Sequence, residues 1–508
     1  MLQLGALDEL VLLAYLALML GMGLYFSRRN VSTEEYFLGG RRFSGWVIGL
    51  SLVGTSISSI TFLAYPGDAF KTSWLRYLPN LMLPVSVAVA AYVFLPRFRQ
   101  GNTISAYEFL EQRYGPSVRV YGALAFIIGQ LVRISTILYL LGLLIQQVAG
   151  LDPVTAIWVA GVFVSLYTVI GGIDAVIWTD VMQTLVLLLG GVLCLYIVID
   201  LLPGGLATIW REAAAAGKLS VADYRDGQLV PVGWGLSLSE KTATMMLVLG
   251  LTNWLTEYSS NQNTVQRFCA ARSMQEARRG LLVCAVSSLP IWAFYMFLGT
   301  SLWVFFQHFP TDVSAEILAG TRKAEEILPY FATHYLPGGA LGLVLAAALA
   351  AAMSSLDSSI NAVTTVAVTD IYRRHVAPDR SDRHYLRVAW SIAVVVSVIM
   401  VAGALAIMRA DTRTLQDTAT ILVSLFGGGL LGLYLYGFLV KGGDSRAVWL
   451  GVAVTMAFTA WSVLASYGKL PPALQLPFDL YYTGIIGNVL MFATIGVAAR
   501  LLPPRVSG

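Results

Sequence analysis

Long apolar runs alternate with short polar connections along the whole chain. A run of about twenty apolar residues is long enough to cross the hydrocarbon core of a bilayer as one helix. We therefore expect an all-α polytopic membrane protein with about thirteen spans and no soluble domain. The expected spans are 7–27, 45–66, 75–96, 120–148, 153–172, 176–201, 242–265, 281–307, 337–369, 386–408, 416–440, 447–467 and 482–502.

Composition excludes a soluble protein of this length. Hydrophobic residues make up 57% of the chain and charged residues only 12%, against about 25% charged in an ordinary soluble domain. Cys194, Cys269 and Cys284 lie in or beside apolar segments, and no two of them have CxxC spacing. They therefore predict neither a metal site nor a disulfide framework.

Charged residues orient the predicted spans. Asp8 and Glu9 precede the first apolar run, whereas Arg28 and Arg29 follow it. A cleaved signal peptide would have its basic residues first, so we expect a retained span with its amino end outside. Most of the 33 lysines and arginines, Arg267 among them, then fall in inside loops, as the positive-inside rule requires. The carboxyl end is expected inside.

Two blocks of five spans follow the first helix. Because five is odd, the second block enters the membrane with the opposite orientation, which is the inverted-repeat arrangement of many transporters. The predicted organisation is a single membrane domain, 1–508. Its parts are an extra helix at 7–27, a first repeat at 45–201, an inverted repeat at 242–440 and two final helices at 447–502.

The second span contains five hydroxyl side chains between Gly54 and Thr61, shortly before Pro66 and Gly67. Serine and threonine can bond back to the helix, and the nearby proline and glycine weaken its hydrogen-bond ladder. Backbone carbonyls could then turn towards an ion. A hydroxyl-rich contact between two helices explains the same pattern. Both interpretations stay open on the residues alone.

The ninth span places four small residues on one helical stripe, Ala351, Ser354, Ser355 and Ser358. Neutral hydroxyl oxygens suit an alkali cation that must bind and then leave. A small-residue packing seam is the alternative. Asp357 lies about 100° from this stripe. It could serve a second cation, carry a proton or form a structural pair.

Other ionisable residues also fall within predicted spans. Asp180 opens the sixth span, Arg133 lies well inside the fourth and Glu257 lies in the seventh. Charges at this depth usually face a cavity or a partner. Arg133 either pairs with a buried acceptor or binds an anionic solute group with two hydrogen bonds. The polar, aromatic stretch 252–262 predicts a discontinuous helix that lines the solute site.

Several ordered motifs resemble the sodium:solute symporter family, and in these motifs the bacterial sialic acid symporters are most similar. The resemblance spans nearly the whole chain. It is carried by Tyr36-Phe37-Leu38-Gly39-Gly40, by Gly171-Gly172-Ile173-Asp174-Ala175-Val176 with Thr179-Asp180 and Gln183, by Gln262 and Gln266-Arg267, and by Met353-Ser354-Ser355-Leu356-Asp357-Ser358-Ser359.

The resemblance implies a core of two inverted five-helix repeats, as in the leucine transporter, that works by alternating access. It implies a first sodium site made by Gly54, Ile57, Ala351, Ser354 and Ser355. It implies a second sodium site made by Asp180, Ser355, Asp357 and Ser358. The family usually has alanine at the position of Gly54 and serine at that of Asp357.

For the solute, the resemblance implies contacts from Ser56, Ser58, Thr61, Asn80 and Arg133, and the polar seventh span adds Trp254, Glu257 and Tyr258. Arg133 would face a carboxylate. The sialic acid transporters have glutamine at the position of Asn80 and threonine at that of Ser56. The sugar-carrying members have asparagine at the position of Trp254 and a tyrosine at that of Glu257, which argues against sugar recognition of that type.

We therefore expect a secondary symporter, not an enzyme. It would couple inward sodium movement to uptake of a small carboxylate, such as a sialic acid or another monocarboxylate. The alternatives are a sodium-coupled sugar or amino-acid symporter, or a proton-coupled symporter that uses Asp357 or Asp180. Sodium is the expected co-transported ion, without an organic cofactor. The expected partners are the solute, sodium and the lipid bilayer of the plasma membrane, with no nucleic acid, and the chain is expected to function as a monomer.

Overall fold

The computed structural model describes residues 4–57, 60–100, 103–225, 228–409, 427–466 and 468–502. Within these ranges the chain is mostly helical. Nine helices are long and apolar enough to cross a membrane, or ten if one sharply bent pair counts as a single span. Eight of these spans contain the long helices α1 (Ala6–Ser27), α8 (Pro116–Ala149), α9 (Pro153–Leu201), α13 (Met274–His308), α16 (Ala340–Val366), α17 (Asp382–Arg409), α20 (Ser445–Ser466) and α21 (Thr483–Leu501). The ninth, Leu75–Phe98, is assembled from shorter helical segments.

Shorter elements complete the described chain. The remaining α-helices are α2 (Thr33–Leu38), α3 (Gly45–Ser56), α4 (Tyr65–Lys71), α5 (Leu83–Val89), α6 (Leu95–Phe98), α7 (Glu108–Tyr114), α10 (Gly205–Ala215), α11 (Ala243–Ser260), α12 (Gln262–Ala270), α14 (Asp312–Ala319), α15 (Ile327–Tyr335) and α19 (Leu430–Leu439). Single turns of 3-10 helix are η1 (Gly39–Arg41), η5 (Ala324–Glu326), η7 (Pro472–Leu474) and η8 (Leu480–Tyr482), and η3 (Leu75–Met82) is longer. Segments of π-helix are η2 (Ile60–Ala64), η4 (Ala90–Phe94) and η6 (Ala367–Val376).

Three interruptions shape the helical bundle. The helical segments Gly45–Ser56 and Thr61–Lys71 meet at an angle of 63°. α11 ends at Ser260, and Asn261 has an extended backbone before α12 begins. The expected spans 153–172 and 176–201 are joined in the 49-residue α9, where Gly172 breaks the helical geometry with φ 60°. A side chain at Gly172 would be strained in this conformation and would lie 2.9 Å from the ring of Tyr36.

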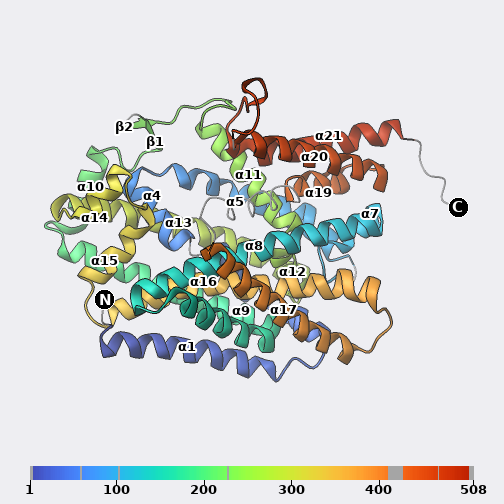
Figure 1. Ribbon diagram of the computed structural model, residues 1–508, viewed down its shortest axis with the longest axis horizontal. Helices are drawn as coiled ribbons and strands as arrows, with labels where there is room; N and C mark the ends of the chain where they lie inside the picture. Colours follow the sequence, from blue (N-terminus) through green and yellow to red (C-terminus); the bar gives the residue numbers. More distant parts are fainter. Residues whose placement is uncertain are drawn as a thin grey trace.

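α16 lies at the centre of the bundle and α1 at its edge. The two spans differ in how much of their most apolar stretch is buried inside the protein. This share is 83% for the span that contains α16 and 22% for α1. α16 packs along α9, α8 and α17, and Figure 1 shows α1 running along the lower side of the molecule. The two helices still meet. Asp8 accepts hydrogen bonds from the backbone N–H groups of Gly339 and Gly342, both at 2.7 Å, and so caps the start of α16.

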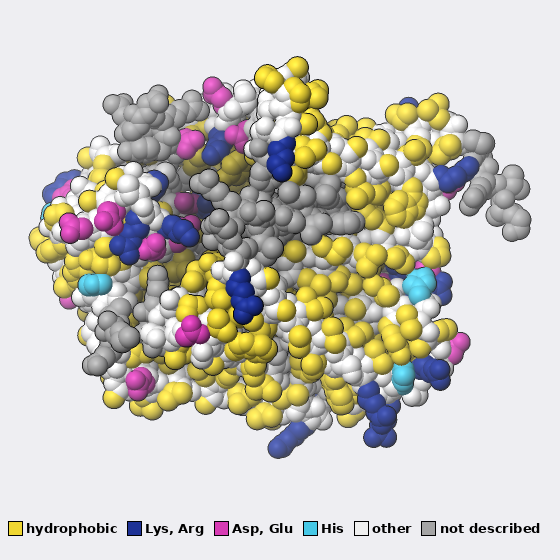
Figure 2. Space-filling view, viewed as in Figure 1, with side chains coloured by type: hydrophobic (Ala, Val, Ile, Leu, Met, Phe, Trp, Pro, Cys, Tyr) yellow, Lys and Arg dark blue, Asp and Glu magenta, His cyan; other side chains and the backbone are white. Residues whose placement is uncertain are grey.

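The two ends of the molecule differ from its middle. The short helices α10, α14 and α15 and the hairpin of β1 (Ala222–Arg225) and β2 (Gln228–Pro231) lie at the left of Figure 1, and α7 lies at the right. The strands are antiparallel, and Ala222 pairs with Pro231. Charged side chains gather mostly at these two ends, and hydrophobic side chains cover much of the surface between them (Figure 2). A bilayer would cover this apolar surface.

Arg267, which sequence reasoning assigned to an inside loop, lies in the interior of the described structure. Arg267 lies in α12 and is only 1% exposed. The structure places Arg267 in a helix and not in a loop, because the polar segment Gln262–Ala270 is helical although it has no apolar run to mark it. The fifth span of the predicted second repeat, 416–440, lies partly outside the described residues, which resume at Gly427.

Candidate ion and solute site

Residues at the end of α3 and from α9 and α16 surround a small void. Gly54, Ile57, Ala351 and Ser354 line this void together with Ala350 and with Gln183, Thr184 and Leu187 of α9, and it is too narrow to admit a water molecule. Gly54 lies in the last turn of α3, where backbone carbonyls lack a partner within the helix. Ser355, the fifth residue assigned to the first sodium site, does not line the void, but its buried hydroxyl has no hydrogen-bond partner in the described structure. Carbonyl and hydroxyl oxygens of this kind are the ligands that an alkali cation uses.

Close packing explains why glycine stands at position 54. A Cβ atom there would lie 2.8 Å from Thr184 Oγ1 and 3.0 Å from the backbone oxygen of Asp180, both on α9. The lack of a side chain therefore lets α3 approach α9 closely at the level of the cavity.

A buried ion pair lies next to this cavity. Asp180 Oδ2 accepts from Arg267 Nη2 at 2.6 Å and from Ser51 Oγ at 2.6 Å, and Asp180 Oδ1 accepts from Ser354 Oγ. Arg267 also donates to Ser51 Oγ at 2.7 Å and to Ser358 Oγ at 2.8 Å. The side chains of Asp180 and Arg267 are 0% and 1% exposed. The guanidinium therefore neutralises the carboxylate that sequence reasoning assigned to a second sodium ion.

Asp357 has a different set of partners. Its carboxylate accepts from Tyr167 Oη at 2.9 Å, from Thr179 Oγ1 at 3.2 Å and from the backbone N–H of Ser358 at 2.6 Å. Among the described residues none of its hydrogen-bond partners is basic, although Asp357 is completely buried. Ser358 instead bonds to Arg267. Of the four residues assigned to the second sodium site, Asp180 and Ser358 thus bond to Arg267, Asp357 bonds to Tyr167 and Thr179, and Ser355 has no hydrogen-bond partner in the described structure. Ser354 rather than Ser355 contacts Asp180.

Sequence reasoning missed four residues of these clusters as members of the site, Ser51, Tyr167, Thr179 and Arg267. Ser51 lies one helical turn before Gly54 and so faces α9 together with it. Spacing could have identified this residue. In the sequence, Arg267 stands out only as part of a motif. Its partner Asp180 is 87 positions away in the chain, so no local pattern could reveal the pair.

A second and larger cavity, of about 600 Å³, lies between α8, α11, α19 and α21. It contains one basic and one acidic side chain, Arg133 and Glu257. The residues that line it are Ala125, Phe126, Gly129, Gln130, Val132, Arg133, Thr252, Asn253, Thr256, Glu257, Ser260, Asn261, Gly427, Gly428, Leu430, Gly484 and Asn488. A cavity of this volume is large enough for a small organic solute.

The two charged residues of this cavity are held differently. Glu257 accepts hydrogen bonds from Asn261 Nδ2 at 2.7 Å and from Thr264 Oγ1 at 2.6 Å, which fixes its carboxylate at the break between α11 and α12. Arg133 is half-buried and makes no hydrogen bond or ion pair with the part of the chain that the structure describes. Its five N–H donors are therefore available to an acceptor that enters the cavity.

The other residues predicted to contact the solute do not line this cavity. Asn80 donates to Tyr65 Oη at 2.8 Å. Trp254 packs against Trp292 with ring centroids 5.2 Å apart, and Tyr258 is buried.

Three residues near the end of α3 complete the predicted solute set. Ser56 is half-buried at that end, and Thr61 is buried. Ser58 lies outside the described residues.

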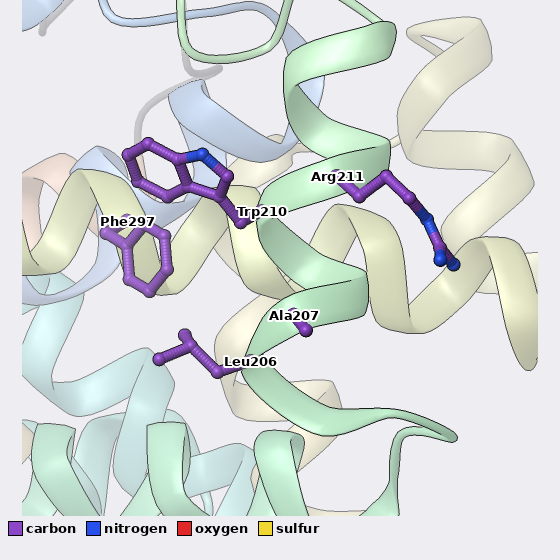
Figure 3. Close-up of a pocket in the computed structure, with 5 residues that line it drawn as sticks. All are labelled: Leu206, Ala207, Trp210, Arg211 and Phe297. Atoms are coloured by element: carbon purple, nitrogen blue, oxygen red, sulfur yellow. The ribbon is translucent and has the colours of Figure 1, made fainter.

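A further cavity, of about 710 Å³, lies at the surface between α10 and α13. Figure 3 shows Leu206, Trp210 and Phe297 directed towards a common space and Arg211 directed away from it. This cavity has an apolar lining and contains none of the predicted site residues. It lacks the polar groups that a carboxylate or an alkali cation needs.

Comparisons with known proteins cover nearly the whole chain. The model of the sodium:solute symporter family matches residues 36–459. The sodium/sialic acid symporter SiaT of Proteus mirabilis is 30% identical over 503 residues, covering 98% of this chain and 96% of that protein. The sodium/sialic acid symporter NanT of Aliivibrio fischeri is 28% identical over 489 residues, covering 96% and 92%. A solved structure of a Na⁺-coupled sialic acid symporter, substrate-bound and outward-open, matches with a TM-score of 0.87 at 30% identity, covering 98% of this chain and 99% of that one.

Proposed function

The chain belongs to the sodium:solute symporter family, and from this premise we propose that its solute is a small carboxylate, such as a sialic acid or another monocarboxylate. The protein is a multi-pass membrane transporter and not an enzyme. It couples the movement of sodium to that of a solute by alternating access.

The unpaired guanidinium of Arg133 carries the proposal for a carboxylate. A charged side chain at membrane depth is costly unless it has a partner, and Arg133 has none in the described structure. A carboxylate could accept two parallel hydrogen bonds from the guanidinium, with matching geometry and charge. The sialic acids transported by the relatives SiaT and NanT are carboxylic acids, which agrees with this assignment. Ser56, Ser58, Thr61, Asn80, Trp254, Glu257 and Tyr258 remain the proposed remainder of the solute site.

The proposed first sodium site consists of Gly54, Ile57, Ala351, Ser354 and Ser355. Four of them share one small void, and the fifth has a buried hydroxyl without a partner, which supports the assignment. Sodium between α3 and α16 would hold these helices together and favour the state that binds solute. By linkage, the solute would raise the sodium affinity by the same factor.

A second sodium ion at Asp180, Ser355, Asp357 and Ser358 remains part of the proposal. Each ion moved would contribute about 2.3 kcal/mol per 100 mV of membrane potential. Arg267 already supplies one positive charge to Asp180, so the charge of Asp180 does not by itself require a second sodium ion. The ratio of sodium to solute therefore decides whether a second ion is transported. A ratio of one to one, obtained from reversal potentials in proteoliposomes, would remove the second ion.

The proposed architecture has thirteen spans, with five-helix repeats at 45–201 and 242–440. The helix at 7–27 precedes them and the two helices at 447–502 follow. The broken segments between α3 and α4 and between α11 and α12 occupy corresponding positions in the two proposed repeats, which supports this division. We place the amino end outside and the carboxyl end in the cytoplasm of the plasma membrane. One chain would suffice for transport, because both cavities lie within it.

Uptake into proteoliposomes tests the carboxylate assignment. Radiolabelled N-acetylneuraminate, lactate and a neutral sugar would be compared under an inward sodium gradient and in choline. We expect sodium-driven uptake of a carboxylate, with a loss of at least about tenfold in apparent affinity in Arg133→Gln. The exposed Arg211→Gln should retain wild-type affinity. An unchanged affinity in Arg133→Gln would refute the role of Arg133.

A further inference from the structure

Glu257 gives the solute cavity a negative charge that a simple carboxylate would leave without a partner. It lines the same cavity of about 600 Å³ as Arg133, and neither residue forms an ion pair with any described side chain. We propose that the solute carries an ammonium group as well as a carboxylate, with Glu257 binding the ammonium and Arg133 the carboxylate. This inference rests on the proposed function, because it assumes that Arg133 binds a carboxylate.

Helical spacing directs both residues into the cavity. Gln130 and Arg133 are three residues apart on α8, so they share one face. On α11, Asn253, Thr256, Glu257 and Ser260 follow at steps of three, one and three, which again puts them on one face. All six residues line the cavity. The position of Glu257 therefore follows from the register of α11, and the cavity presents one positive and one negative group from two facing helices.

The carboxylate of Glu257 is fixed in place but retains acceptor capacity. Asn261 Nδ2 donates to one oxygen and Thr264 Oγ1 to the other. Two carboxylate oxygens offer about four acceptor sites, so about half of this capacity remains. Both donors are uncharged, and they hold the carboxylate in position without neutralising it. Pre-positioning of this kind favours a cationic ligand.

The end of α11 adds to the negative potential around Glu257. Glu257 lies in the last turn of this helix, which ends at Ser260. The carboxyl end of a helix has a partial negative charge from its unpaired carbonyls. In transporters with interrupted helices, such ends coordinate cations. The same end that positions Glu257 would therefore also stabilise an ammonium group.

The net charge of the occupied cavity differs between a solute with an ammonium group and a carboxylic acid without one. A plain carboxylate would neutralise Arg133 and leave Glu257 as a net negative charge at membrane depth, which is unfavourable. A solute with both groups would leave the cavity neutral. Hydroxyl groups could also donate to Glu257, but they would not remove its charge. The structure thus favours a zwitterion over a polyhydroxy acid.

Binding to the wild-type protein provides the first test. In saturating sodium, dissociation constants would be measured for the protein amino acids and for the matching acids that lack the amine, such as phenylalanine against 3-phenylpropanoate. N-acetylneuraminate and lactate would be included as acids without an ammonium group. We expect at least one amino acid to bind about tenfold or more tightly than its matching acid and than either of these two. Tighter binding of N-acetylneuraminate or lactate than of every amino acid would overturn the inference.

The variant Glu257→Gln provides the second test, with the exposed Glu316→Gln as its matched control. In Glu257→Gln we expect the preference for the amine to disappear, because the amino acid loses affinity and the matching acid does not. An equal loss for both probes would mean that Glu257 only holds the helix break together, and would overturn the inference. Retained stabilisation by sodium alone would show that the variant is folded.

Arg133→Gln separates the two levels of the proposal. If it abolishes binding of the best probe while Glu257→Gln has no effect, the carboxylate assignment stands and the ammonium assignment fails. If binding of the best probe is unchanged in Arg133→Gln, the proposed function itself fails.

Discussion

Arg267 donates to Asp180 at 2.6 Å in the interior of the bundle, where neither side chain is exposed by more than 1%. The pair joins α12 to α9, and Ser51 of α3 and Ser354 and Ser358 of α16 bond to one or both partners. Four helices that surround the proposed sodium site therefore meet at one pair of charges.

Arg267→Met should strongly destabilise the protein, because it leaves Asp180 buried and uncompensated. Loss of one partner of a buried ion pair typically costs about 3–5 kcal/mol. In the double variant Arg267→Met/Asp180→Asn, part of this stability should return, since no buried charge remains. Melting temperatures of the purified variants in sodium-free buffer check this. A double variant less stable than either single variant would show that the charges of the pair do not dominate its contribution.

Ser355→Ala should separate ion binding from folding. The Ser355 hydroxyl has no partner in the described structure, so its removal should change stability in choline by less than about 1 kcal/mol. Sodium affinity should fall by about tenfold if the hydroxyl is an ion ligand. Sodium-dependent melting curves measure both effects. Ser397→Ala, which affects a serine of α17 bonded only to its own helix, should leave sodium binding intact. An unchanged sodium affinity in Ser355→Ala would remove this residue from the site.

Gly54→Ala should weaken sodium binding. Its Cβ would lie 2.8 Å from Thr184 Oγ1, so α3 and α9 would have to separate. Overpacking of this kind typically costs about 1–3 kcal/mol. Gly21→Ala is the control, because a Cβ on Gly21 meets nothing within 4 Å. Sodium titrations followed by thermal stability compare the two. Equal behaviour of the two variants would mean that the site adjusts to the extra methyl group.

Lys218 should make stability depend on pH. Its buried ammonium donates to the backbone oxygens of Phe70 and Thr72 at the end of α4, at 2.7 and 2.8 Å. Burial lowers the pKa of Lys218 from 10.5 to about 7. Between these values the unfolded chain binds more protons than the folded one, so stability should rise with pH across this window, by at most about 1.4 kcal/mol per pH unit.

Melting temperatures between pH 6 and pH 9 would test this dependence. The rise should be present in the wild type and reduced in Lys218→Gln. The exposed Lys469→Gln should behave as the wild type. A pH dependence that persists unchanged in Lys218→Gln would assign it to other groups.

Local patterns predicted the helices and the break after α3, but not how distant segments pair. The apolar run 7–27 matches α1, because a single apolar run suffices to define such a span. Hydroxyl groups and Pro66 indicated the break after α3. By contrast, the hairpin of β1 and β2 lies within the connection 202–241, where polar composition gives no periodic signal.

The candidate site was predictable only in part for a similar reason. The stripe of Ala351, Ser354 and Ser358 follows from the period of one helix. The ion pair of Arg267 with Asp180, and the bond of Tyr167 to Asp357, join residues 87 and 190 positions apart. Such pairs depend on how helices pack, and helix packing is not encoded in the periodicity of any one segment.

The most direct test of sodium-coupled carboxylate recognition is the melting temperature of the purified protein with a panel of sugars, amino acids, sialic acids and monocarboxylates, each measured in sodium and in choline. A ligand that binds only the folded protein raises its melting temperature. We predict that a compound with a carboxylate stabilises the protein in sodium and not in choline. Stabilisation by a neutral sugar, equal in sodium and in choline, would contradict the account.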